Sequence, residues 1–413
     1  MRREPFRRDL DLRLASKRPA RLLPQTELRV TTAPLPRGRR RPPEPPPEAS
    51  IVVLTHGNLV FTRMCLESVL ASTPEPAFEL IVVDNASTDG TPDYLVRLAS
   101  RDARVVPILM DANVGFPAGV NAALRAALGR SLVVLNNDTM VAPGWLPGLL
   151  RHLGDPAVGL VGPVTNQAPG VARVGDSYRT YGEFLRMAAA RGGPVRARDV
   201  DRLTLFCAAL PRRVYDCVGP LDERFELGMF EDDDYCLRIA AAGLSIRLAE
   251  DVLVHHFGEA SFGRLVPDGT WMSIFEANRR RFEQKWGRAW AGHVPPDEPE
   301  YTDLVRRVRS IVAMLPDTAR VLVASRGDDR LCSIPGRLAG HFPQMPDGTY
   351  AGSYPADDAG AVRHLEDLSA QGWTHLALPN PARWWLDHYP ALTRRLESVI
   401  DDPAAGVVFR IAS

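Results

Sequence analysis

From Ser50 onward, short runs of consecutive apolar residues alternate with amphipathic stretches. The apolar runs predict strands at 51–54, 80–83, 105–109 and 132–135. Helical patterns lie between them, through 65–70, around 94–98 and over 118–128. Strands of four or five wholly apolar residues separated by helices are typical of a parallel sheet that is buried on both faces. The pattern therefore predicts a doubly wound α/β unit.

Beyond this unit the pattern is less regular. We expect irregular structure over 143–258 and an aromatic-rich helix over 270–286, which would close the first domain. Strand patterns follow at 320–325, 375–378 and 406–411, with helical patterns at 359–370 and 384–399. They predict a second, small α/β domain. The predicted organisation is a tail (1–49), a first domain (50–290), a linker with a helix (291–315) and an accessory domain (316–413).

The first 49 residues differ in composition from the rest of the chain. They hold ten prolines and thirteen basic against six acidic residues, with almost no hydrophobic periodicity. Such a segment is typically disordered and solvated. In the alternative interpretation this basic tail docks on an anionic membrane face or on a partner.

Charge and cysteine content exclude several classes of protein. Over the whole chain 50 basic and 50 acidic residues cancel, which argues against a nucleic-acid partner bound by bulk charge. The five cysteines are odd in number and contain no CxxC, so neither a disulfide framework nor a zinc knuckle is indicated. No apolar run approaches the ~18 residues of a membrane span, and the N-terminus lacks the apolar core of a signal peptide. We expect a cytoplasmic protein, with peripheral association at the inner face of the membrane as the alternative.

Polar residues follow the predicted strands, where ligands bind in sheets of this kind. Asp84 ends the second strand, where its carboxylate can accept hydrogen bonds from a ribose hydroxyl or a base N–H. In the simpler interpretation, Ser87 or Asp89 only caps the next helix. No GxGxxG follows either of the first two strands, which disfavours a nicotinamide or flavin cofactor.

A second polar cluster, Asn136-Asn137-Asp138, ends another strand. Its oxygens suit Mg²⁺ or Mn²⁺ together with diphosphate oxygens, although a simple turn is the alternative. The pair His255-His256 adds imidazoles that are credible further ligands.

Four acids, Glu231-Asp232-Asp233-Asp234, run directly into an apolar helical pattern. A helix N-terminus stabilises acids, and capping explains one or two of the four. Consecutive carboxylates repel one another, which raises the pKa of any buried member and suits a general base.

Six motifs in this order resemble the family 2 nucleotide-sugar glycosyltransferases of the GT-A fold, closest to the rhamnosyltransferase-like subgroup. The resemblance covers about residues 50–290. Its motifs are SIVVLT at 50–55, VVDNASTDGT at 82–91, NVGF at 113–116 with Gly119 and Asn121, LNNDT at 135–139, FEDDDYCLR at 230–238 and VHHFG at 254–258. The implied architecture is a Rossmann-like mixed sheet with flanking helices.

The resemblance also implies roles for individual residues. Asp232 would be the catalytic base, and Asp138 and His255 would contact the divalent cation, Mg²⁺ or Mn²⁺. The nucleotide-sugar-binding residues would be Thr55, Asp84, Asn113, Gly119, Asn136, Asn137 and Asp138. The candidates on the acceptor side are Cys207, Glu231 and Asp234. We expect Asp234 to support structure and Asp233 to face solvent.

The implied reaction is an inverting transfer from a UDP- or dTDP-linked sugar to a glycan, lipid-linked or small-molecule acceptor. A nucleotidyltransferase is one alternative, but it normally has a Gly-rich loop with Arg or Lys after the first strand, where this chain has only Gly57 and Arg63. A non-catalytic binding or scaffold protein is the other alternative, and it would not need the acids Asp84, Asp138 and Asp232.

Overall fold

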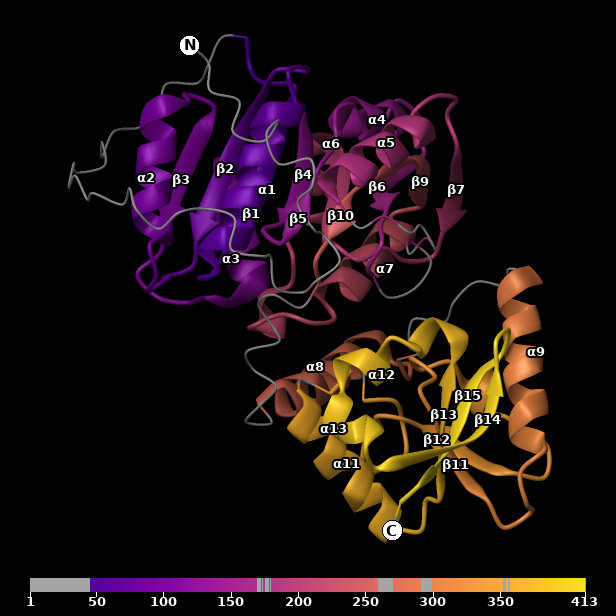
Figure 1. Ribbon diagram of the computed structural model, residues 1–413. Coiled ribbons are helices and arrows are strands. Elements are labelled where there is room, and N and C mark those ends of the chain that lie inside the picture. The colour runs from indigo at the N-terminus through magenta and orange to yellow at the C-terminus, as the bar shows by residue number, and fades with distance from the viewer. Residues whose placement is uncertain are drawn as a thin grey trace. The chain divides into compact units, whose positions relative to one another are not determined.

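The computed structural model describes residues 45–168, 172, 174, 178, 180–258, 270–290, 299–351, 354, 355 and 357–412. The predicted tail lies almost wholly outside these residues. The chain divides into two compact units, Met1–Ser261 and Phe262–Ser413. Each unit is described by itself (Figure 1).

The first unit alternates strands and helices in its first half and mixes them more freely in its second. Its strands are β1 (Ala49–Thr55), β2 (Phe78–Asp84), β3 (Val105–Leu109), β4 (Ser131–Asn136), β5 (Thr139–Met140), β6 (Val158–Val164), β7 (Ala197–Val200), β8 (Cys207–Pro211), β9 (Ser245–Leu253) and β10 (His255–His256). Its helices are α1 (Leu59–Ser72), α2 (Thr91–Arg101), α3 (Gly115–Ala126), α4 (Trp145–His152), α5 (Tyr181–Arg191), α6 (Arg212–Val218) and α7 (Glu231–Ala241), with a 3₁₀ turn at Glu223–Phe225.

Eight of these strands form one mixed sheet in the order β3-β2-β1-β4-β8-β6-β9-β7. The strands β3, β2, β1 and β4 are parallel, whereas β8 runs antiparallel to both β4 and β6. Thr55 pairs with Asp84, and Leu54 pairs with Asn136. The carboxyl ends of β1, β2 and β4 therefore meet at one edge of the sheet.

Both faces of the sheet are buried, which explains the continuous apolar runs in the sequence. Val52 of β1 packs in the same cluster as Val120 of α3, whereas its neighbours Ile51 and Val53 pack in the cluster that contains Leu66 of α1. Figure 1 shows these strands as a twisted sheet with helices alongside. The predicted α/β class, with a mixed sheet and flanking helices, is confirmed.

The second unit is a smaller α/β domain, as predicted. Its elements are α8 (Thr270–Trp286), α9 (Pro299–Ala313), β11 (Arg320–Val323), α10 (Asp329–Cys332), β12 (Leu338–His341), α11 (Asp358–Ala370), β13 (His375–Pro379), a 3₁₀ turn at Asn380–Ala382, α12 (Trp385–His388), α13 (Pro390–Thr393), β14 (Leu396–Asp402) and β15 (Gly406–Ile411). The sheet order is β12-β11-β13-β15-β14. Val308 of α9 packs on one of its faces, and Leu365 of α11 packs on the other.

Three expectations differ from the structure. The helix predicted over 384–399 is two short helices and a strand, because Pro390 lacks an N–H and disfavours helical geometry at Tyr389, which has φ −119° and ψ 71°. The segment 143–258, expected to be irregular, supplies four strands of the mixed sheet, one strand of a separate two-stranded sheet, and four helices. Helix α8, assigned from sequence to the first domain, belongs to the second unit.

Among the helices that the structure describes, none has both the length and the apolar character needed to cross a bilayer.

Candidate active site

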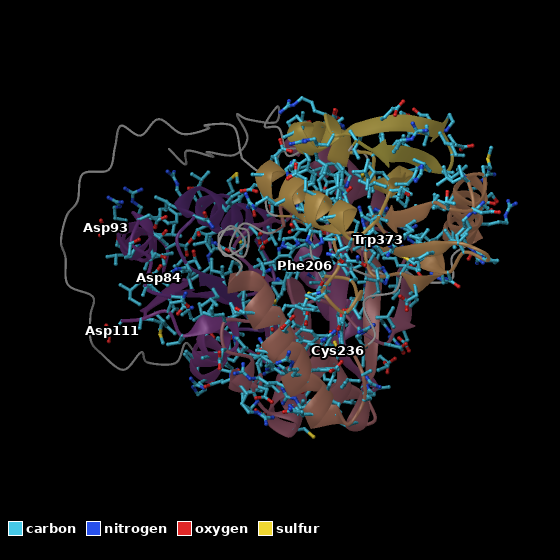
Figure 2. The ribbon with its side chains drawn as sticks, turned by 90° about the horizontal axis from the view of Figure 1, so that it is seen from below. Asp84, Asp93, Asp111, Phe206, Cys236 and Trp373 are labelled. Carbon is cyan, nitrogen blue, oxygen red and sulfur yellow. The ribbon has the colours of Figure 1, made fainter. Side chains whose placement is uncertain are left out.

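Asp84 lies at the shared edge of β1, β2 and β4 and is only 2% exposed. One of its oxygens, Oδ2, accepts the backbone N–H of Ser87 at 3.1 Å. The other, Oδ1, is buried without a hydrogen-bond partner. An unpaired buried carboxylate oxygen is unfavourable unless a ligand completes it. In Figure 2, Asp84 lies inside the first unit, whereas the exposed Asp93 and Asp111 lie at its periphery.

The loops that follow β1 and β2 are tied to each other by side chains of the second loop. Ser87 Oγ accepts the N–H of Gly57 at 2.6 Å, and Asp89 accepts the N–H groups of Leu59 and Thr91 at 3.1 and 3.0 Å. Asp89 therefore serves the first residues of both α1 and α2. The capping interpretation holds for Asp89, and it leaves Asp84 Oδ1 unassigned.

Thr55 and Asn137 belong to a buried polar cluster that joins β1, β4 and α1. The hydroxyls of Thr55 and Thr62 are 2.7 Å apart, and Asn137 Nδ2 donates to both, at 3.2 and 3.1 Å. These contacts hold the two strand ends together. Asn136 uses its carbonyl oxygen here, accepting the hydroxyl of Thr139 at 2.7 Å.

Asp138 is 5% exposed and faces His256, with 3.2 Å between Asp138 Oδ1 and His256 Nε2. His256 Nδ1 lies 2.8 Å from the carbonyl oxygen of Gln167, so this nitrogen carries the proton and donates it. In the neutral imidazole, Nε2 then presents a lone pair to a carboxylate. The contact between the Asp138 oxygen and His256 Nε2 is favourable when the imidazole is protonated, or when a cation binds to both atoms.

His255, which the sequence analysis had named as the metal contact, is packed differently. Its ring lies among Tyr178, Phe184 and Phe257, and Nδ1 is 2.8 Å from the hydroxyl of Tyr178. Burial lowers the pKa of His255 to about 3, so the ring is neutral. Its Nε2 is buried without a partner. Adjacent residues of a strand point to opposite faces, and the one that lies beside Asp138 is His256.

The donor set at this point suits a hard divalent cation. Within the described part of the chain, no group of three or more His, Cys, Asp or Glu side chains is arranged to hold a metal. The carboxylate of this pair suits Mg²⁺ or Mn²⁺, which binds through one or two carboxylates while substrate phosphates and water supply the remaining ligands, and the imidazole is an additional, softer donor.

The acid run begins α7 after a turn with unusual backbone geometry. Glu226, Met229 and Phe230 all have positive φ, at 49°, 76° and 73°. Such residues cost about 1–3 kcal/mol each and persist only where their surroundings determine them, often at functional sites. The turn places the half-buried Asp232 in the first turn of α7, where its Oδ1 accepts the N–H of Asp233 at 2.8 Å.

The environment of Asp232 favours its protonated form. Burial raises the pKa of Asp232 to about 7, and the charge of Asp233 adds to the effect, while the Arg202 guanidinium opposes it. Burial, followed by the charge of Asp232, raises the pKa of Glu231 well above its usual range. Glu231 Oε2 is buried without a partner. A carboxyl group with a pKa near neutrality suits a general base.

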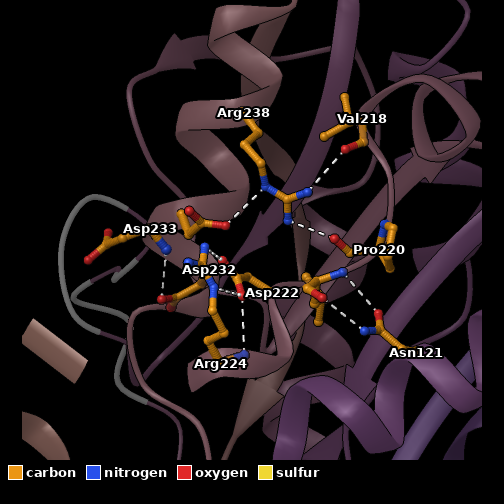
Figure 3. A network of polar contacts seen from close by, with 10 residues as sticks. Asn121, Val218, Pro220, Asp222, Arg224, Asp232, Asp233 and Arg238 are labelled. Carbon is orange, nitrogen blue, oxygen red and sulfur yellow. Dashed lines mark hydrogen bonds and ion pairs between the residues drawn. The ribbon is translucent and has the colours of Figure 1, made fainter. Parts of the chain in front are cut away.

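The other two acids are engaged within the protein. Asp234 is fully buried and accepts Arg238 Nε at 3.0 Å (Figure 3). Asp233 was expected to face solvent, but the structure buries it and places Arg202 Nη1 3.4 Å from its Oδ1. The side of α7 that carries Asp233 packs against the segment that carries Arg202. The run of four acids in the sequence does not reveal this contact.

The segment Arg202–Phe206 links the acid run to the Asp138 pair. Leu203 N–H lies 3.4 Å from the sulfur of Cys236 on α7. At the other end of the segment, the Phe206 ring stacks on His256, with centroids 4.9 Å apart and planes 15° apart. Neither Arg202 nor Phe206 carries a sequence signal of its own, so both were missed.

The remaining residues predicted for the site have structural surroundings. Asn113 Oδ1 accepts Asn85 Nδ2 at 2.7 Å and the N–H of Gly115 at 3.0 Å. A Cβ on Gly119 would lie 2.5 Å from Leu54 Cδ1, so this glycine lets α3 pack closely on β1. Cys207 is fully buried in β8.

Comparison with known proteins identifies relatives of the first unit. Residues 50–219 match the model of the family described as Glycosyl transferase family 2. The chain is 30% identical over 289 residues to the O-antigen biosynthesis protein RfbC of Myxococcus xanthus, which covers 66% of this chain and 21% of RfbC. It is 27% identical over 238 residues to the N-acetylglucosaminyl-diphospho-decaprenol L-rhamnosyltransferase of Mycobacterium tuberculosis, over 50% of this chain and 75% of that protein.

A solved structure of the mannosyltransferase PcManGT from Pyrobaculum calidifontis, in complex with GDP-Man and Mn²⁺, aligns with a TM-score of 0.41 and 22% identity, over 57% of this chain and 64% of that one. The chain thus matches about a fifth of the length of RfbC and about three quarters of the length of the rhamnosyltransferase.

Proposed function

From the premise that residues 50–219 form a domain of glycosyl transferase family 2, we propose that the chain is an inverting glycosyltransferase. It moves a sugar from a nucleoside-diphosphate donor to a hydroxyl group of a glycan, lipid-linked or small-molecule acceptor. One observation carries the proposal. The edge of the sheet that presents the unpartnered Asp84 Oδ1 also presents Asp138 with its Oδ1 3.2 Å from Nε2 of His256.

Asp84 recognises the nucleoside of the donor. Its free Oδ1 accepts the N–H of a base or a ribose hydroxyl, while the bond from Ser87 holds the carboxylate in place. We propose a UDP- or dTDP-linked hexose or deoxyhexose, whose uracil or thymine presents an N–H that Asp84 Oδ1 can accept. The name of the rhamnosyltransferase relative supports a deoxyhexose.

Asp138 and His256 hold the divalent cation, and His256 replaces His255 in this proposal. When bound, Mg²⁺ or Mn²⁺ supplies positive charge beside the departing diphosphate. The chain prepares the two ligands in advance. Gln167 fixes the tautomer of His256, and the Phe206 ring fixes its plane.

Asp232 acts as the general base. Its carboxylate takes the proton of the acceptor hydroxyl as the oxygen bonds to the anomeric carbon, and the bond from that carbon to the diphosphate oxygen breaks. The nucleoside diphosphate leaves, and the configuration inverts in this single displacement. An oxocarbenium-like transition state needs little nucleophilic power, so a carboxylate base suffices.

The biological setting is proposed from the names of the relatives. RfbC is an O-antigen biosynthesis protein, and the rhamnosyltransferase is named for a lipid-linked diphosphate sugar. We propose that this chain acts in polysaccharide or cell-wall synthesis in the cytoplasm, with its basic tail at the inner face of the membrane.

Replacement of Asp138 tests the metal-assisted site. Asp138→Ala and His256→Ala should each abolish the gain in nucleoside diphosphate affinity that Mn²⁺ or Mg²⁺ produces, and Asp138→Ala should nearly abolish turnover. Asp93→Ala, an exposed acid on α2, is the control and should behave as the wild type. Calorimetric titration with and without the metal makes the measurement. Equal turnover in excess chelator would contradict the proposal.

A further inference from the structure

Gly115, the first residue of α3, lies directly against the strained turn that precedes the acid run. We propose that Gly115, held by Asn85, is a positioning residue for Asp232. The backbone of Gly115, called the seat below, contacts Glu226 and Leu227. These two residues begin the segment Glu226–Phe230, which leads into the first turn of α7. The inference rests on the proposed function, because it assigns the position of the proposed base.

The contact at Gly115 leaves no room for a side chain. A Cβ there would lie 1.9 Å from the carbonyl oxygen of Glu226, 2.6 Å from its carbonyl carbon and 3.0 Å from Leu227 Cα. All three are backbone atoms, so no side-chain rotation relieves the clash. Gly115 also has φ +81°, which L-residues rarely adopt. The N–H of Phe116 donates to the carbonyl of Leu227 at 3.3 Å and completes the seat.

Asn85 fixes the seat to the end of β2. Its Nδ2 donates to Asn113 Oδ1 at 2.7 Å and to the carbonyl of Gly115 at 3.2 Å. Its Oδ1 accepts the N–H of Val114 at 2.9 Å. Asn85 is 2% exposed and directly follows Asp84. One buried amide therefore joins the proposed nucleoside site to the seat.

The segment on the seat is anchored on both sides. Upstream, the Asn121 side chain exchanges hydrogen bonds with the backbone of Leu221, and Arg238 donates to the carbonyls of Val218 and Pro220 (Figure 3). Downstream, the carbonyl of Phe230 accepts the N–H of Asp234 within α7. Because both ends of the segment are held, we expect a displacement of Glu226 to change the backbone of the turn before Asp232.

Two glycines give a matched test. Gly144 has φ +87°, like Gly115, but nothing lies within 4 Å of a Cβ placed on it. Gly144→Ala therefore adds backbone strain alone, whereas Gly115→Ala adds the same strain and pushes on Glu226. We expect Gly115→Ala to lower kcat at least tenfold with the donor KM and the nucleoside diphosphate Kd within about threefold of wild type. Gly144→Ala should keep its kcat.

A second pair of variants covers the case in which Gly115→Ala does not fold. Asn85→Ala removes the hydrogen bonds that hold the seat. Ser50→Ala is its control, because it removes buried hydrogen bonds to Glu79 and from Gly129 at the opposite end of β1. We expect kcat to fall for Asn85→Ala and not for Ser50→Ala.

Hydrogen exchange measures the order of the segment on the seat independently of catalytic activity. Amides of 226–234 should exchange faster in Gly115→Ala than in Gly144→Ala. Equal exchange and equal kcat in the two variants would overturn the inference, and so would a loss confined to donor affinity. Absence of turnover in the wild type with every donor, together with faster exchange in Gly115→Ala, would instead refute the proposed function and leave the seat standing.

Discussion

At the scale of single residues, the four acids at the start of α7 differ in how free they are to accept a proton. Asp233 and Asp234 each pair with an arginine, whereas Asp232 is half-buried and accepts the N–H of Asp233. Asp232→Asn keeps the bond from the N–H of Asp233, so the turn is preserved. Turnover should fall by about 10²–10⁴ while nucleoside diphosphate binding is retained.

Asp234→Asn is the informative comparison for this prediction, because Asp234 is two positions further along the helix. It should lower stability by weakening the bond with Arg238. If Asp234→Asn is folded and inactive while Asp232→Asn turns over normally, the base is Asp234 and the assignment is displaced by two residues.

The raised pKa of Asp232 predicts the dependence of activity on pH. A base works in its ionised form, so kcat should fall as the pH drops through about 7. Arg202 lowers this pKa, and Arg202→Met should therefore move the acidic limb to higher pH. The pH–rate profiles of the wild type and of Arg202→Met at saturating donor measure the two acidic limbs. An acidic limb near pH 4 in the wild type would contradict the assignment.

At the scale of elements, the buried carboxylate of Asp251 ties α4 to β9. Asp251 is buried between Arg151 Nη2 at 2.5 Å and His152 Nε2 at 2.8 Å. Asp251→Ala leaves Nε2 of the buried His152 without its partner, whereas Arg151 is partly exposed and keeps its contact with the carbonyl of Gly193. The variant should destabilise the first unit by about 1–3 kcal/mol.

Asp199→Ala is the control for this prediction, because Asp199 forms an exposed pair with Arg247 that also joins β9 to a neighbour. Its effect should be at most about 1 kcal/mol. Denaturant unfolding compares the two variants, and equal losses would show that burial does not decide the energy.

The sequence predicts elements where local pattern decides structure. The strands β1, β2 and β4 are apolar on both faces, so their positions and the gathering of Thr55, Asp84 and Asp138 at one edge follow from pattern alone. The choice of His256 over its neighbour depends on the pairing of β10 with β5, which lies more than a hundred residues away. The contact between Gly115 and Glu226 also joins residues that are far apart in the sequence, so no local pattern predicts it.

At the scale of the whole chain, the first unit begins slightly before the predicted boundary at residue 50. The carbonyls of Pro47 and Glu48 accept the N–H groups of Arg130 and Ser131, and Glu48 N–H donates to the carbonyl of Ala77. A chain shortened to 45–413 should keep its turnover on soluble acceptors. A chain shortened to 50–413 should lose about 2–3 kcal/mol with these bonds. Thermal unfolding compares them, and failure of the 45–413 chain to fold would show that the tail belongs to the domain.

The central claim is that the chain uses a nucleoside-diphosphate sugar with a divalent cation. The most direct test incubates the purified full chain with a panel of UDP-, dTDP- and GDP-linked sugars and Mn²⁺ or Mg²⁺, and measures nucleoside diphosphate release and binding. We predict release from at least one UDP- or dTDP-linked donor, loss of release in chelator, and loss of release in Asp232→Asn with binding retained. If the folded chain neither releases nor binds any nucleoside diphosphate, the claim is contradicted.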